Sequence, residues 1–312
     1  MKFKLGSDPE LMLEDSEKRV LKSAITVIPE GKGEGRNINK GAALHDNVLV
    51  EFNTDPADSE DEFIDTLTGV LNDLAKLVNK SGCGLLLQAS AEFPAEELAH
   101  PEAMVFGCDP DWDAWIVGKN TSPDPFEVGA LRSAGGHLHI GMGDDPNINA
   151  VLDHPLGKLV VVKAMDVFCL LPWLMIEQDP TSKRRRELYG KAGAFRPKPY
   201  GVEYRAISAS WLTSPAHARL IYRLVDVAVS FAAADGIDAI SDEFTCGPKL
   251  QSVIEQIGGA EIQRIINQSD IEAAKGVYDN VLKPLIGETL ADYFAEVQSM
   301  QVQNFNDAWR TL

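Results

Sequence analysis

Four short runs of this chain alternate strongly polar with apolar residues, and this period-two pattern restricts the fold more than any other feature. In the run 135–142, "GGHLHIGM", His137 and His139 flank Leu138. Successive side chains of a strand point to opposite faces, so the two imidazoles would share one face. The same spacing recurs in the pairs Asp8 and Glu10, Glu51 and Asn53, and Glu203 and Arg205. We therefore expect four strands, each with one polar and one apolar face.

Apolar residues elsewhere recur with helical spacing. Ser59 and Glu62 form a capping box at the start of a helix over 59–80. The same periodicity predicts helices over 156–177 and 215–234, and two or three more within 249–312. A further β-like run covers 84–93. Amphipathic helices are expected to cover the apolar face of the sheet.

These patterns predict an α+β fold with a largely antiparallel sheet, helices packed on one of its faces and a polar face on the other. We expect that sheet to contain 2–13, 47–53, 135–142 and 200–208. The whole chain, 1–312, is expected to form a single domain. Its sheet-rich core would span 1–211 and its helical part 212–312.

Composition limits the partners. The net charge of −18 over 312 residues argues against general binding to nucleic acids or anionic membranes. The four cysteines lie far apart without a CxxC pair, which is typical of reduced thiols in a cytoplasmic protein; they are Cys83, Cys108, Cys169 and Cys246. The N-terminal segment does not have the pattern of a signal peptide, and we expect no membrane span.

If the four runs share one sheet, their polar faces converge into a surface of carboxylates, imidazoles and a guanidinium. Carboxylate oxygens and imidazole nitrogens are ligands of divalent metals, and a shell dominated by carboxylates suits Mg²⁺ or Mn²⁺ better than Zn²⁺. A half-solvated antiparallel sheet shows the same alternation without any site. The four pairs together favour a site, since Gly135, Gly136 and Gly141 would leave space for a triphosphate against the backbone.

The segment 182–205 is locally basic within an acidic chain, which indicates a small anionic ligand such as nucleotide phosphates. We interpret most of the run Lys183 to Arg186 as a solvated helix end. Arg196, Lys198 and Arg205 lie among glycines and prolines or in a strand, and these three are the candidate phosphate ligands. The chain has neither GxxxxGK[ST] nor GxGxxG, so a nucleotide would not bind through a P-loop or a Rossmann turn.

Five motifs resemble the phage-type carboxylate–amine ligases, an amidoligase family related to glutamine synthetase and glutamate–cysteine ligase. They are "GSDPELML", "DNVLVEFNTDPA", "FGCDPD", "RSAGGHLHIG" and "YGKAGAFRPKPYGVEYRAIS". The resemblance extends from residue 6 to about residue 211, and GGHxHxG and GVEYR are its most specific parts. It implies a sheet of the glutamine synthetase type. It also implies a catalytic domain that uses ATP and Mg²⁺ or Mn²⁺ to join a carboxylate to an amine through an acyl phosphate.

The resemblance also implies roles for individual residues. As metal ligands it implies Glu10, Glu51, His137 and Glu203, with Asp8 in the same shell. His139 resembles the histidine that contacts phosphate, and Arg205 the arginine that holds the transferred phosphoryl group or the substrate carboxylate. Arg196 and Lys198 would contact the nucleotide phosphates. We predict Arg205, His139 and Glu51 as the catalytic residues.

Two other functions remain open from the residues alone. HxH strands also occur in metal-dependent hydrolases, and the polar face could belong to a metal-stabilised binding protein without enzymatic activity. For a ligase we expect small-molecule or peptide carboxylates and amines as substrates, in the cytoplasm, or in the host cytoplasm if a phage encodes the chain. The sequence makes no prediction of the oligomeric state.

Overall fold

The computed structural model describes residues 2–31, 33, 35–104, 111–121, 128–302 and 304–310. Within them, eleven strands form one sheet whose main path is β3-β4-β5-β1-β11-β13-β12-β8-β9. Its strands are β1 (Phe3–Asp15), β2 (Leu21–Lys22), β3 (Arg36–Ile38), β4 (Gly41–Asp46), β5 (Leu49–Thr54), β6 (Cys83–Leu86), β8 (Trp112–Asp113), β9 (Gly118–Lys119), β11 (Gly136–Met142), β12 (Ala194–Lys198) and β13 (Gly201–Tyr204). The described strand pairs are antiparallel.

The four predicted strands lie in this one sheet as the neighbours β5, β1, β11 and β13, so this prediction is confirmed. The long strand β1 lies in the middle of the set, where it pairs with β11 along Phe3 to Pro9 and with β5 at Glu10 and Leu11. The apolar alternates are buried; Leu5, Leu138 and Val202 have no exposed surface.

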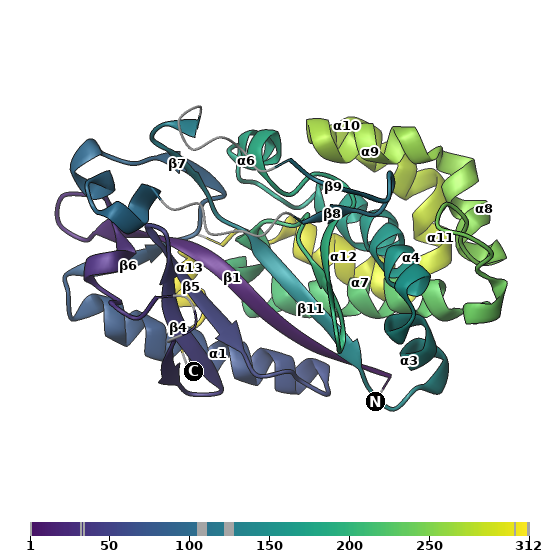
Figure 1. Cartoon of the computed structure of the whole chain (residues 1–312), viewed down its shortest axis with the longest axis horizontal. Helices are drawn as coiled ribbons and strands as arrows, with labels where there is room; N and C mark the ends of the chain where they lie inside the picture. The colour runs from purple at the N-terminus through teal and green to yellow at the C-terminus, as the bar shows by residue number, and fades with distance from the viewer. Residues whose placement is uncertain are drawn as a thin grey trace.

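Helices cover the apolar face of the sheet. Figure 1 shows α1 and α7 lying behind the strands, while α8 to α11 gather at one end of the molecule. The helices are α1 (Glu60–Asn79), α3 (Pro146–Asp153), α4 (Pro155–Met165), α5 (Leu171–Trp173), α6 (Ser182–Leu188), α7 (Pro215–Ala233), α8 (Pro248–Ile257), α9 (Gly259–Gln268), α10 (Ile271–Val277), α11 (Lys283–Ile286), α12 (Glu288–Ser299) and α13 (Phe305–Ala308). The predicted α+β fold, with helices on one face and a polar face opposite, is confirmed.

The helix α1 begins where its capping box predicts. Ser59 Oγ accepts a hydrogen bond from Glu62 N at 3.0 Å, and Glu62 Oε2 accepts one from Asp58 N at 2.7 Å. The carboxylate thus satisfies the amide one residue before the expected cap. Buried residues such as Phe63, Leu67 and Leu74 form the stripe that faces the sheet.

Several predicted details of the elements are wrong. The run 84–93 is divided, because β6 pairs with β1 whereas β7 (Ser90–Glu92) pairs with β10 (Leu131–Ser133) in a separate two-stranded sheet. Strand 200–208 ends at Tyr204 and a 3₁₀ turn follows over Ala209–Thr213. The last third holds more helices than the two or three expected, since glycines at 258 and 287 divide α8 from α9 and α11 from α12.

The predicted helix 156–177 ends at Trp173 and is widened in its middle. After α4 it forms a π-turn over Asp166–Leu170, in which Leu171 N donates to Asp166 O. Pro172 follows directly, and because proline has no N–H it cannot continue the regular ladder of α-helical hydrogen bonds. Among the described residues, no helix combines the length and the hydropathy needed to cross a bilayer.

Candidate functional site

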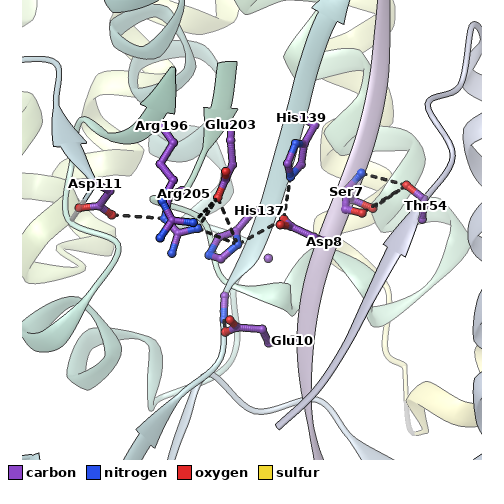
Figure 2. A network of polar contacts seen from close by, with 12 residues as sticks. Ser7, Asp8, Glu10, Thr54, Asp111, His137, His139, Arg196, Glu203 and Arg205 are labelled. Atoms are coloured by element: carbon purple, nitrogen blue, oxygen red, sulfur yellow. Dashed lines mark hydrogen bonds and ion pairs between the residues drawn. The ribbon is translucent and has the colours of Figure 1, made fainter. Parts of the chain in front are cut away.

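The register of the sheet brings the predicted polar residues together on the face opposite the helices. Asp8 pairs with His137 across β1 and β11, His139 pairs with Glu203 across β11 and β13, and Glu10 pairs with Glu51 across β1 and β5. Figure 2 shows most of these side chains pointing into one network of polar contacts. Strand alternation alone therefore places a row of ionisable groups side by side.

Asp8 is the centre of this row. Its Oδ1 lies 2.9 Å from His139 Nε2 and 3.3 Å from His137 Nδ1. Burial by itself would raise the pKa of Asp8, but the charge and hydrogen bond of His137, and those of His139, lower that pKa well below its usual range. Asp8 is therefore a carboxylate held between two imidazoles.

Glu203 is buried among three cationic side chains. Its Oε2 lies 2.7 Å from Lys198 Nζ, and its Oε1 lies 3.4 Å from Arg196 Nη1 and also contacts Arg205 Nη1. Burial opposes ionisation, but Arg205 and His137 outweigh it and lower the pKa of Glu203 to about 2. One buried carboxylate thus contacts three cationic side chains.

Arg205 connects both ends of the network (Figure 2). Its Nη1 lies 3.3 Å from His137 Nδ1, and its Nε lies 3.4 Å from Asp111 Oδ2. Asp111 ends the motif "FGCDPD", whose other residues, Cys108 among them, fall outside the described residues. We did not predict Asp111 as a site residue, since an aspartate in a loop rich in Pro and Asp gives no sign of its distant partner.

A second acidic cluster lies beside the first. Ligand atoms of Glu10, Asp46 and Glu51 lie within 4.8 Å of one another. Burial raises the pKa of Glu10, and Asp46 raises it further, against the opposing charge of His137. Asp46, which ends β4, was not predicted, because the alternation of that strand breaks at the turn that follows it.

Both clusters have the donor chemistry of a divalent-cation site. Asp8, His139 and Glu203 also bring their ligand atoms within 4.8 Å of one another. Five carboxylates and one imidazole supply mostly hard oxygen donors, which fit Mg²⁺ or Mn²⁺.

A pocket of ≈ 460 Å³ opens beside these clusters over β5, β1 and β11. Asp8, Glu51 and His139 are among its lining residues, and Pro56, Met142 and Tyr200 provide apolar and aromatic surface. The Tyr200 hydroxyl contacts His139 Nδ1. Tyr200 was not predicted; the only signal for it was its place in the turn before Gly201.

Three glycines were expected to leave space for a triphosphate. At two of them the protein itself occupies that space. A Cβ at Gly135 would lie 2.2 Å from His137 Nε2, and one at Gly136 would lie 2.2 Å from the Ser208 carbonyl oxygen. These glycines therefore admit a histidine ring and a neighbouring loop rather than a ligand. Gly141 does line the pocket.

The interpretation of the run Lys183 to Arg186 as a solvated helix end is wrong for half of it. Lys183 and Arg184 are exposed, but Arg185 and Arg186 are buried. Arg186 pairs with the buried Glu177 at 3.0 Å. Arg185 donates to the carbonyl oxygens of Arg205 and Ala206. Helix α6 presents one side to the protein interior, and its two buried arginines occupy that side.

The model of a family described as phage phiEco32-like COOH.NH2 ligase-type 2 matches residues 130–242, which include His137, His139, Glu203 and Arg205. No curated protein matches. One similar solved structure is described as "GmaS/ADP complex-Conformation 1"; it has 15% sequence identity and a TM-score of 0.42, and the match covers 95% of this chain and 69% of that chain. The family match confirms the resemblance that the motifs indicated: residues 130–242 of this chain are similar to this family of carboxylate–amine ligases.

Proposed function

We propose that the protein is an ATP-dependent ligase that forms an amide bond between a carboxylate and an amine through an acyl phosphate. The observation that carries the proposal is the junction at Glu203, where a cluster of potential metal ligands meets three cationic side chains. Phosphoryl transfer from ATP requires both features, because charge on the phosphate oxygens must be neutralised while the groups are held in line.

The metal ions would be held by Asp8, Glu10, Glu51, Glu203 and the histidines, with Asp46 added to the predicted set. When bound, Mg²⁺ or Mn²⁺ neutralises charge on the phosphate oxygens. Arg196 and Lys198 lie beside Glu203. They would exchange part of that contact for phosphate oxygens, which accept charge-assisted hydrogen bonds from such cations.

The nucleoside fits the neighbouring pocket best. That pocket offers the ring of Tyr200 and the apolar surfaces of Met142 and Pro56, and Asp8 and His139 also line it. A flat base packs well against such surfaces. A nucleotide in the pocket would place its phosphates toward His139 and Arg205.

The reaction has two steps. A carboxylate oxygen of the first substrate attacks the γ-phosphorus of ATP, the bond to the β-phosphate oxygen breaks, and ADP leaves. The amine nitrogen then attacks the carbonyl carbon, inorganic phosphate leaves, and the nitrogen loses a proton. Arg205 would bind the phosphoryl oxygens in the first step, and its contacts with Glu203 and Asp111 hold its guanidinium in place. Small-molecule or peptide acids and amines of the cytoplasm are the substrates we propose.

The direct test is ADP release from ATP in the presence of panels of carboxylates and amines, with product masses recorded. We expect an amide product and one ADP per amide, with Mg²⁺ or Mn²⁺ but not in EDTA. Phosphate release that needs no amine, or hydrolysis of an amide without ATP, would instead favour a hydrolase.

A matched pair of lysine variants tests the phosphate contact. Lys198→Ala removes a cation that lies 2.7 Å from Glu203, and Lys191→Ala removes an exposed one from the same segment. We expect the first change to weaken ATP binding by roughly tenfold to a hundredfold, in line with about 1.5–3 kcal/mol for a charge-assisted hydrogen bond. The second should leave binding unchanged. Equal effects would contradict the assignment of Lys198.

A further inference from the structure

The guanidinium of Arg185 lies behind the candidate site and binds the main chain that carries Arg205. Nη2 donates to Arg205 O at 3.0 Å and Nη1 donates to Ala206 O at 3.2 Å. Arg185 is 2% exposed and comes from α6, a helix separate from the strands that form the site. A fork of two parallel donors thus fixes two consecutive carbonyl groups.

These carbonyl groups lie where the sheet no longer holds the chain. Strand β13 ends at Tyr204, and in its pairing with β12 the last matched residues are Phe195 and Tyr204. Arg205 N still donates to Ala194 O at 2.9 Å. The carbonyl oxygen of Arg205 is bound by Arg185 instead of a strand. The direction in which the Arg205 side chain leaves the main chain therefore depends on Arg185.

Burying this guanidinium is costly for a purely structural contact. Both of its hydrogen bonds are made to neutral carbonyl oxygens rather than to a carboxylate. Its Nε has no hydrogen-bond partner among the described residues. Burial lowers the pKa of Arg185 to about 10, and Arg186 contributes in the same direction. An apolar side chain would fill the same space at a lower desolvation cost.

The loop after α6 is shaped around the guanidinium. Gly190 has φ +72, which favours glycine, and a Cβ there would lie 1.9 Å from Arg185 Nη1. The turn therefore needs a glycine both for its backbone conformation and for the space that the guanidinium occupies.

We propose that Arg185 is a positioning residue for Arg205: it holds the main chain at residues 205 and 206 so that the Arg205 guanidinium is aimed at the phosphoryl group. This inference rests on the proposed function, since it needs Arg205 to bind phosphate. Arg185 itself is too deeply buried to reach a ligand in the pocket.

A double-mutant cycle tests the proposal. Affinity for the non-hydrolysable analogue AMP-PNP with Mg²⁺ is measured by calorimetry for the wild type, Arg185→Lys, Arg205→Lys and the double variant. Lysine keeps the charge at 185 but cannot bind both carbonyl oxygens. We expect each single change to weaken binding by about tenfold or more, and the double variant to bind no more weakly than Arg205→Lys alone.

Two further variants complete the design. Arg184→Lys alters the exposed neighbour on the same helix and should bind as the wild type does. Gly190→Ala changes no arginine in the sequence, but its added methyl group displaces the Arg185 guanidinium. The effect of this variant on binding should also vanish in the Arg205→Lys background. It serves as the second probe if Arg185→Lys does not fold.

The outcomes separate the two levels of the hypothesis. If the wild type does not bind AMP-PNP with Mg²⁺, the proposed function is overturned, and the inference with it. If the wild type binds but the effects of Arg185→Lys and Arg205→Lys multiply, Arg185 acts independently of Arg205 and the inference alone is overturned. A loss in Arg184→Lys equal to that in Arg185→Lys would overturn it as well.

Discussion

Glu203 shows how strongly a single side chain can determine the electrostatics of this site. It is 1% exposed and contacts Arg196, Lys198 and Arg205. This carboxylate contacts all three cations and offsets part of the repulsion among them. A polyanion that enters the site could bind some of these cations in place of Glu203. The Glu203 carboxylate would then be available to bind a metal ion.

Replacement of Glu203 by Gln tests this arrangement in the ligand-free protein. Loss of one partner from a buried ion pair leaves an uncompensated charge, so we expect the free energy of unfolding to fall by about 3–5 kcal/mol. Urea denaturation measures it. Glu92→Gln is the control, because Glu92 is 62% exposed in its pair with Arg184 and such a pair contributes about 0–1 kcal/mol. Equal losses would contradict the role of Glu203.

At the scale of elements, the alternating runs predict much of the sheet but little of its detail. His137 and His139 share a face because of strand geometry, which the sequence shows directly. The partners of those histidines follow from the register, and no residue near 137 indicates that Asp8 lies opposite it. Arg185 and Lys183 have the same charge in the same helix, so composition could not tell the buried arginine from the exposed lysine. The sequence shows Pro172 directly, but it gives no sign of the π-turn that precedes this proline.

The N-terminus of α7 carries a histidine that makes stability depend on pH. His217 Nδ1 lies 2.8 Å from Ser214 Oγ, and the ring packs edge-on against Trp173. Burial lowers the pKa of His217 from 6.5 to about 4. The folded state therefore binds this proton less readily than the unfolded state. The stabilisation is present above pH 6.5 and is lost as the pH falls through 6.5 toward 4.

His217→Gln should remove that dependence. At ~1.4 kcal/mol for each pH unit between the two pKa values, we expect the wild type to lose about 3 kcal/mol more than the variant between pH 6.5 and 4. Urea denaturation of both proteins at several pH values gives the difference. Because the carboxylates that titrate in this range are common to both proteins, they cancel. Parallel curves would show that His217 is not the source.

For the whole molecule, a net charge of −18 has two consequences for metal binding. It attracts divalent cations to the surface in general. It also means that carboxylates gathered in one place repel one another and destabilise the ligand-free protein. In the two clusters on the polar face, this repulsion acts at the site itself. A test of specific binding must therefore separate the clusters from the general acidic surface.

Stabilisation by Mg²⁺ provides that test. A cation that binds only the folded state at ten times its Kd raises the free energy of unfolding by about 1.4 kcal/mol. We expect this rise in the wild type, and a clear reduction in Asp8→Asn and Glu51→Gln, one variant for each cluster. Glu296→Gln removes the same charge from an exposed position on α12 and should keep the full rise. If all three variants respond like the wild type, or all three lose the response equally, Mg²⁺ binds the acidic surface as a whole. The carboxylates of the polar face would then have no special affinity for it.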